Sequence, residues 1–164
     1  MRKLYCFGEY QNVFDNYSNV EFHDWLPDLV TFDGKSRTLL VLDDLTTSTD
    51  DRIVDLFTKI SHHRNFSVVY LTQDIFYKIK QSRTLSLNSH YLVLFINARD
   101  ASQVANLARQ MYHGKSAFMI EAFKNAASAP YGYLLIDLKQ ETDDNLRIRS
   151  GLFPEDDLFV YVRK

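Results

Sequence analysis

The sequence is poor in cysteine, proline, glycine and tryptophan. Among its 164 residues there is one cysteine, Cys6, with five glycines, three prolines and one tryptophan. A single cysteine excludes an internal disulfide and fits a reducing compartment, so we expect a protein of the nucleus or cytoplasm. So few glycines and prolines argue against long disordered or low-complexity segments.

The chain also lacks a strong charge of either sign and any long apolar run. Its net charge is -2 and its pI is about 6.2, so a DNA contact would have to be local or shared among subunits. No apolar stretch approaches the roughly 20 residues of a membrane span. The segment MRKLYCFGEY carries two basic residues but no apolar core of a signal peptide. We therefore expect no membrane partner.

What the chain does have is enough apolar bulk for a core. Hydrophobic residues make up 46% of the sequence and aromatic residues 14%. With 164 residues, this composition predicts a single globular domain over residues 1–164.

Short apolar runs alternate with helical patterns along the chain. Runs that are apolar on both faces and separated by helices indicate a parallel sheet covered on both sides. The sequence therefore predicts an α/β three-layer domain. The expected strands are 4–7, 38–44, 67–73, 90–96 and 132–138, with weaker ones at 20–22, 146–149 and 158–162.

Four helices are expected between these strands. One follows Thr49 or Asp50 as N-cap, with an apolar face, and a short one covers 75–79 before a polar loop. Another begins after Asp100 and ends at Gly114, and the last begins at Ser116. The expected apolar positions are Ile53, Leu56, Phe57, Ile60, Val104, Leu107, Ala108, Met111, Phe118, Ile120, Ala122 and Phe123.

Two adjacent acids, Asp43 and Asp44, end the apolar run at 39–42. Open α/β sheets bind ligands at the carboxyl ends of their strands. In phosphate-loop enzymes the first such acid holds Mg²⁺, and the next can act as a general base toward the attacking water. Many α/β proteins, however, end a strand with an acid that caps the next helix. Taken alone, the acid pair favours this second interpretation.

Further polar residues follow the next strand. Gln73 could sense a γ-phosphate or orient water, or simply bond a loop backbone. His62 and His63 are neighbours whose side chains diverge on a helix, so they are poor metal ligands. Arg64 or Arg99 could reach a phosphate on a neighbouring subunit, although a solvated arginine is the favoured interpretation of each.

Two Gly-Lys-Ser tripeptides resemble the end of a phosphate loop, G-x-x-x-x-G-K-[ST]. The first glycine of that pattern would fall at Leu29 for the tripeptide at 34–36 and at Arg109 for the one at 114–116. The first tripeptide also leads into a strand, and the second follows a helix that Gly114 ends. Neither is a phosphate loop.

Long ordered motifs resemble a known family. The segments YCFGEYQNVF, NVEFHDWLPDL, RTLLVLDDL, FTKISHHRNFSVVYLTQDIF, RTLSLNSHYLVLFINARDASQVANLARQMY and EAFKNAASAPYGYLLIDL look like the DNA-packaging ATPase of Maverick/Polinton elements and their viral relatives. That family belongs to the FtsK–HerA group of P-loop ATPases and is akin to the poxvirus packaging ATPase. The resemblance extends from Leu4 to about Pro154.

The resemblance implies a site and partners. Asp43 would coordinate Mg²⁺, Asp44 would activate water, and Gln73 would be the polar sensor. The cofactors would be Mg²⁺ and ATP, and the partners double-stranded DNA, capsid components and further copies of the chain in a ring. The family's arginine that acts on a neighbouring subunit has no secure counterpart here.

One departure from the family is large. Its members carry a strand, a phosphate loop and a helix ahead of the YCFGEYQ segment, and a βαβ unit takes at least ~30 residues. The expected fold is thus a RecA-like sheet without its first strand, and neither Mg²⁺ nor ATP should bind tightly. The absent strand would lie between the strands at 90–96 and 132–138. We expect 132–138 to close up beside 90–96, in one parallel sheet with 38–44 and 67–73.

The leading hypothesis is a truncated ATPase that would couple ATP hydrolysis to DNA translocation in its intact form, and that is inactive as this chain alone. The alternative is a non-enzymatic, domesticated interaction module that binds partner subunits or DNA. A third is an incomplete gene model, for which an in-frame GxxxxGK[ST] upstream of Met1 would be the sign.

Overall fold

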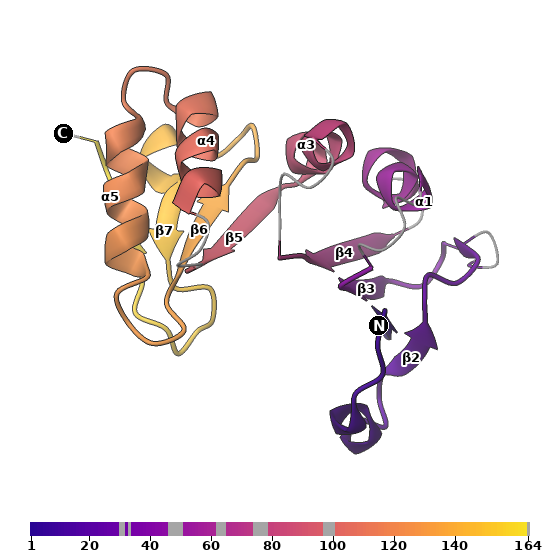
Figure 1. Ribbon diagram of the computed structural model, residues 1–164. Helices are drawn as coiled ribbons and strands as arrows, with labels where there is room; N and C mark the ends of the chain where they lie inside the picture. The colour runs from indigo at the N-terminus through magenta and orange to yellow at the C-terminus, as the bar shows by residue number, and fades with distance from the viewer. Residues whose placement is uncertain are drawn as a thin grey trace. The chain divides into compact units, whose positions relative to one another are not determined.

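A computed structural model describes residues 1–29, 32, 34–45, 51–61, 65–73, 79–96 and 101–163. The chain forms two compact units, unit 1 (Met1–Asn88) and unit 2 (Ser89–Lys164), each with a four-stranded sheet (Figure 1). The protein is thus a mixed α/β protein, as predicted. A single domain over residues 1–164 stays a prediction.

Unit 1 is built on a parallel sheet, sheet A, with strand order β2-β1-β3-β4. The strands expected at 38–44 and 67–73 are confirmed as parallel neighbours, and the strand at the start of the chain pairs beside them. The prediction that the strand at 90–96 shares their sheet is wrong, because that strand belongs to the sheet of unit 2. The elements of unit 1 are β1 (Arg2–Phe7), the 3₁₀ helix η1 (Asn12–Asn16), β2 (Glu21–Asp24), β3 (Thr38–Asp43), α1 (Asp51–Asp55), the π-helical η3 (Leu56–Ile60), β4 (Phe66–Leu71) and α3 (Ile79–Asn88).

One face of sheet A carries the core of unit 1. Leu4, Leu40 and Leu42 are at most 1% exposed, and Ile53 of α1 and Leu56 of η3 belong to the same apolar cluster. Figure 1 shows α1 and α3 on the same side of this sheet. The expected apolar face of the helix after residue 50 is therefore confirmed. Its proposed caps, Thr49 and Asp50, lie outside the described residues, as does Asp100.

The other face of sheet A is covered over β1 and β2 by η1. Phe14 of η1 stacks on Phe22 with 4.7 Å between ring centroids and lies 5.3 Å from the Tyr5 ring. On β4, Val69 and Leu71 are each 42% exposed. Within the described residues, coverage of this second face thus decreases from β2 towards β4, whereas the sequence predicts a sheet covered on both sides.

Helix α3 begins at Ile79, the last residue of the predicted short helix, and otherwise occupies a segment that the sequence predicts to be a polar loop. Residues 75–78 of that predicted helix lie outside the described residues. Its sequence, IKQSRTLSLN, has little amphipathic character: Leu85 packs on the core of unit 1, while Leu87 is 72% exposed. Lysine, glutamine, arginine and leucine nevertheless have good helix propensity. The helix was missed because its apolar face is narrow.

Unit 2 contains an antiparallel sheet, sheet B, with strand order β5-β6-β7-β8. Its elements are β5 (Tyr91–Phe95), α4 (Ala101–Met111), α5 (Ser116–Ala126), β6 (Tyr133–Asp137), the 3₁₀ helix η4 (Asp144–Leu146), β7 (Ile148–Ser150) and β8 (Phe159–Val160). Val104, Leu107 and Ala108 of α4 are buried, and Met119 and Ala122 of α5 are too. Gly114, between the helices, has φ +74°, as expected of a glycine that ends a helix.

The predicted pairing of the strand at 90–96 is partly wrong. The strand at 132–138 does lie beside it, as expected, but β5 and β6 are antiparallel, with Val93 opposite Leu135. The reason is the connection. A single crossover helix returns the chain to the end of the sheet at which the first strand began, so the next strand is parallel to it. Here two helices follow one another, α4 and α5, which lie side by side in Figure 1. The second helix reverses the chain again.

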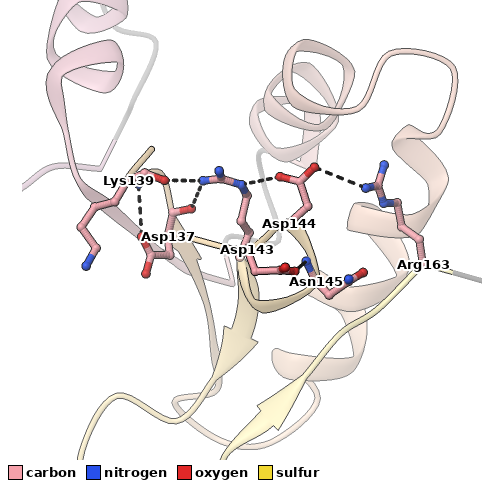
Figure 2. A network of polar contacts seen from close by, with 7 residues as sticks. Asp137, Lys139, Asp143, Asp144, Asn145 and Arg163 are labelled. Carbon is pink, nitrogen blue, oxygen red and sulfur yellow. Dashed lines mark hydrogen bonds and ion pairs between the residues drawn. The ribbon is translucent and has the colours of Figure 1, made fainter. Parts of the chain in front are cut away.

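A polar network fixes the end of β6 in unit 2 (Figure 2). The Arg147 guanidinium donates to the carbonyl oxygens of Asp137 and Lys139 at 3.1 and 2.7 Å, and its Nε donates to Asp144 Oδ1 at 2.8 Å. The Asp137 carboxylate, 3% exposed as a residue, accepts from Arg149 at 3.1 Å and from the Lys139 backbone N–H at 3.2 Å. These bonds satisfy buried carbonyl and carboxylate oxygens, so the network is structural.

Candidate functional site

The three predicted site residues meet where the strands of sheet A end, at their carboxyl ends. Asp43 ends β3 and lies opposite Leu71, which ends β4. Asp44 and Gln73 follow these strand ends and, together with Asp43, line one open hollow of about 460 Å³. The remaining lining residues are Gly8, Glu9, Gln11, Leu71 and Thr72. Parallel strands thus bring together side chains that are 30 residues apart in sequence, because their carboxyl ends share an edge.

Tyr5 is a part of this site that sequence reasoning missed. Its hydroxyl donates to Asp43 Oδ2 at 2.7 Å. In the register of β1 and β3, Tyr5 lies opposite Val41, and Asp43 is two residues further along, on the same face. The contact could therefore have been predicted from the strand pairing. When two strands are paired, a residue and the residue two positions beyond its partner lie on the same face of the sheet.

The environment of Tyr5 keeps its hydroxyl protonated. Burial, the hydrogen bond to Asp43 and the charge of that carboxylate together raise the pKa of Tyr5 to about 12. A hydroxyl with this pKa remains a hydrogen-bond donor throughout the neutral range.

The backbone at Asp44 turns sharply. Asp44 has φ +51°, in the left-handed region that aspartate tolerates better than most residues. Its N–H donates to the carbonyl oxygen of Leu71 at 3.4 Å. Gly8 lies against this turn, since a Cβ placed on Gly8 would be 3.0 Å from the Asp44 carbonyl oxygen. The turn carries Asp44 out of the strand and into the lining of the hollow.

The oxygen donors of the hollow are of the type that Mg²⁺ binds, and they do not suit a triphosphate. Asp43, Asp44, Thr72 and Gln73 offer hard oxygen donors, which Mg²⁺ prefers, and Mg²⁺ commonly keeps several waters. Within the described ranges no group of three or more His, Cys, Asp or Glu is placed to hold a metal, so Mg²⁺ would depend on water and outside donors. The lining residues include three carboxylates and no lysine or arginine. These residues would repel phosphate groups rather than hold them.

The first Gly-Lys-Ser tripeptide lies at the other end of β3, where that strand begins. It precedes Thr38, the first residue of β3, and a strand of this length spans about 20 Å. Gly34 has φ +69°, and its carbonyl oxygen accepts from Asn65 Nδ2 at 2.8 Å. This is the geometry of a turn that enters a strand, so Lys35 does not belong to the acidic hollow.

The second tripeptide is a short turn between helices. The Lys115 N–H donates to the Tyr112 carbonyl oxygen at 2.9 Å, and α5 begins at Ser116. A helix precedes it rather than a strand, as expected. His62, His63, Arg64 and Arg99 lie outside the described residues, and the role of an arginine stays a prediction.

Comparisons with known proteins return nothing that bears on the chain: no protein-family model, no curated protein and no solved structure matches it. Among the helices in the described part of the chain, none is long and apolar enough to cross a membrane. The function is therefore inferred from the residues and their geometry.

Proposed function

We propose that unit 1 carries the acidic half of a Mg²⁺-dependent site for nucleotide hydrolysis, of the kind found in DNA-packaging ATPases. The observation that carries this proposal is the convergence of Asp43, Asp44 and Gln73 around one hollow at the carboxyl edge of a parallel sheet. The sequence resemblance to the packaging ATPases assigns roles to the same three residues.

Each residue has a distinct role in the proposed site. Asp43 is the metal ligand, at the end of a strand that is hydrogen-bonded on both sides. Asp44 accepts a proton from the attacking water as general base, and Gln73 orients that water with its amide. A bound Mg²⁺ would supply charge neutralisation to the phosphate groups.

The phosphate-holding half must come from other residues. The described lining has no basic side chain, and loss of even one preorganised donor costs roughly 2.7–4 kcal/mol in transition-state stabilisation. We therefore propose that the chain alone does not turn over ATP. Transport of double-stranded DNA, capsid partners and a ring of subunits belong to the intact ATPase that this chain resembles.

Addition of a phosphate-holding half tests the proposal. A strand, phosphate loop and helix from a packaging ATPase, joined ahead of Met1, should give Mg²⁺-dependent ATP hydrolysis. Asp43→Ala should weaken Mg²⁺-dependent binding, whereas Asp44→Asn should retain binding and lose turnover. Asp24→Asn, at the end of β2, is the matched control and should behave as the parent does. Full turnover in either site variant would remove the role assigned to that residue.

A non-enzymatic interaction module is the second candidate, and exposed apolar strands favour it. β4 and β5 are terminal strands of their sheets, and neither contains the lysine or proline that often protects an edge. Val69 and Leu71 on β4 are 42% exposed, and Phe95 on β5 is 61% exposed. If these strands bind other subunits, sedimentation velocity should show concentration-dependent association that Val69→Lys or Phe95→Lys weakens. A monomer at all concentrations would exclude association between copies of this chain.

A further inference from the structure

We propose that Tyr5 is a positioning residue for Asp43, one that fixes the carboxylate so that a single oxygen remains for a divalent cation. This inference rests on the proposed function of the acidic hollow and adds a residue to it. The observation is the hydrogen bond from the Tyr5 hydroxyl to Asp43 Oδ2, 2.7 Å long. Asp43 also lines the hollow, so this hydrogen bond joins Tyr5 to a residue of the site.

The tyrosine itself is firmly held. Its ring packs beside two rings that stack on each other, with centroids 5.3 Å from Phe14 and 5.7 Å from Phe22, and Phe14 is only 7% exposed. Once the ring of a tyrosine is packed, its two side-chain torsions are fixed, and so is its hydroxyl oxygen. Because β1 and β3 are hydrogen-bonded neighbours, the distance between the two residues is set by the sheet.

A fixed carboxylate binds a metal better than a free one. An aspartate that rotates freely can present either oxygen, or both, and must lose that freedom on binding. A hydrogen bond to one oxygen removes this loss in advance. Removal of a group that hydrogen-bonds to a metal ligand, without itself binding the metal, typically lowers metal affinity about 10–100-fold. Removal of the Tyr5 hydroxyl should therefore weaken cation binding at least about 10-fold, without removal of any ligand.

Mn²⁺ is the probe for the test, because it replaces Mg²⁺ at oxygen sites and broadens nearby NMR signals. In the ¹⁵N-labelled full chain, Mn²⁺ should broaden the amide signals of Gly8, Asp44 and Thr72, and excess Mg²⁺ should reverse this effect. Tyr5→Phe keeps the ring and should need about tenfold more Mn²⁺ for the same broadening. Asp43→Asn should lose the effect. Tyr17→Phe, at a tyrosine 54% exposed, is the matched control and should behave as the wild type does.

The possible outcomes separate the two proposals. Equal Mn²⁺ sensitivity in wild type and Tyr5→Phe, with loss in Asp43→Asn, overturns the role of Tyr5 and leaves the acidic site in place. Absence of local broadening in the wild type, or broadening that Asp43→Asn retains, overturns the metal site and the role of Tyr5 with it. Thermal unfolding of Tyr5→Phe shows whether the variant is folded at the temperature of the titration, so that a loss of Mn²⁺ sensitivity is measured on folded protein.

A measurement on the wild-type chain covers the case in which Tyr5→Phe does not fold. A hydroxyl held in a hydrogen bond exchanges slowly with solvent, so in mixed H₂O and D₂O the Tyr5 Cζ carbon should show two resolved signals. Tyr17 should show one averaged signal. A single averaged signal for Tyr5 would overturn the proposal.

Discussion

The backbone N–H of Gly8 donates to the carbonyl oxygen of Asp43 at 3.2 Å, so the chain that leaves β1 lies against the turn that follows β3. A side chain at Gly8 would press on this turn. We expect Gly8→Ala to lower the free energy of unfolding by about 1 kcal/mol and Gly8→Val by more, since the atom in the way belongs to the backbone. Urea denaturation measures both. Equal stability of the two variants and the wild type would contradict the close approach.

The left-handed backbone at Asp44 predicts a specific order of substitutions. Asparagine tolerates positive φ at least as well as aspartate, and glycine has no penalty, but alanine costs about 1–2 kcal/mol there. The stabilities should therefore rank Asp44→Gly and Asp44→Asn above Asp44→Ala, as measured by thermal melts. A more stable Asp44→Ala would mean that the turn is not strained. Asp44→Asn is for this reason the cleanest variant for catalytic tests.

The chain alone should not bind Mg·ATP with micromolar affinity. The acidic hollow has no basic lining residue among those described, and Lys35 precedes the opposite end of β3. Isothermal titration calorimetry should show no saturable heat in this range. A micromolar isotherm abolished by Lys35→Ala or Lys115→Ala would show that a Gly-Lys-Ser tripeptide does bind phosphate.

Alkaline pH should destabilise unit 1. The pKa of Tyr5 is raised from 10.0 to about 12 and, by burial, the pKa of the Cys6 thiol is raised from 9.0 to about 12. Both groups are neutral when protonated, so the stability linked to them is complete below pH 9 and is lost as the pH rises towards 12. Urea midpoints measured between pH 8 and 11 should fall, and the fall should be smaller in Tyr5→Phe and Cys6→Ala. An unchanged pH dependence in both variants would contradict this origin.

The buried carboxylate of Asp137 should contribute more to the stability of unit 2 than exposed carboxylates nearby do. Asp137→Ala leaves Arg149 and the Lys139 N–H without their acceptor and should cost about 2 kcal/mol. Glu141→Ala is the control: its ion pair with Lys139 is 3.8 Å long, and the Glu141 side chain is 74% exposed, so the expected cost is below about 0.5 kcal/mol. Similar urea midpoints for the two variants would contradict the assigned importance of burial.

Local pattern was enough to place most strands and to bring the site residues together. Thr38–Asp43 and Phe66–Leu71 are apolar on both faces, and such strands pair in parallel. Once they are paired, the positions of Asp43, Asp44 and Gln73 follow from the direction of the chain. That part of the site needed no knowledge of tertiary contacts.

The direction of β5 and the role of Tyr5 were out of reach of local pattern. An apolar run such as Tyr91–Phe95 has the same alternation in either direction, so its antiparallel pairing depends on the number of helices that follow. From local sequence alone, Tyr5 is indistinguishable from a core aromatic residue. Only the register of β1 and β3 shows that it lies near Asp43. Both features depend on which strands become neighbours, and that is decided by the packing of whole elements.

The position of β1 has a practical consequence for handling the protein. β1 lies between β2 and β3 in sheet A, and its first residue, Arg2, pairs with Thr38. An affinity tag joined at Met1 would therefore emerge beside an interior strand, and a deletion that removed β1 would separate β2 from β3. The C-terminal side is the safer point of attachment, because Tyr161–Arg163 follow β8, a terminal strand of sheet B.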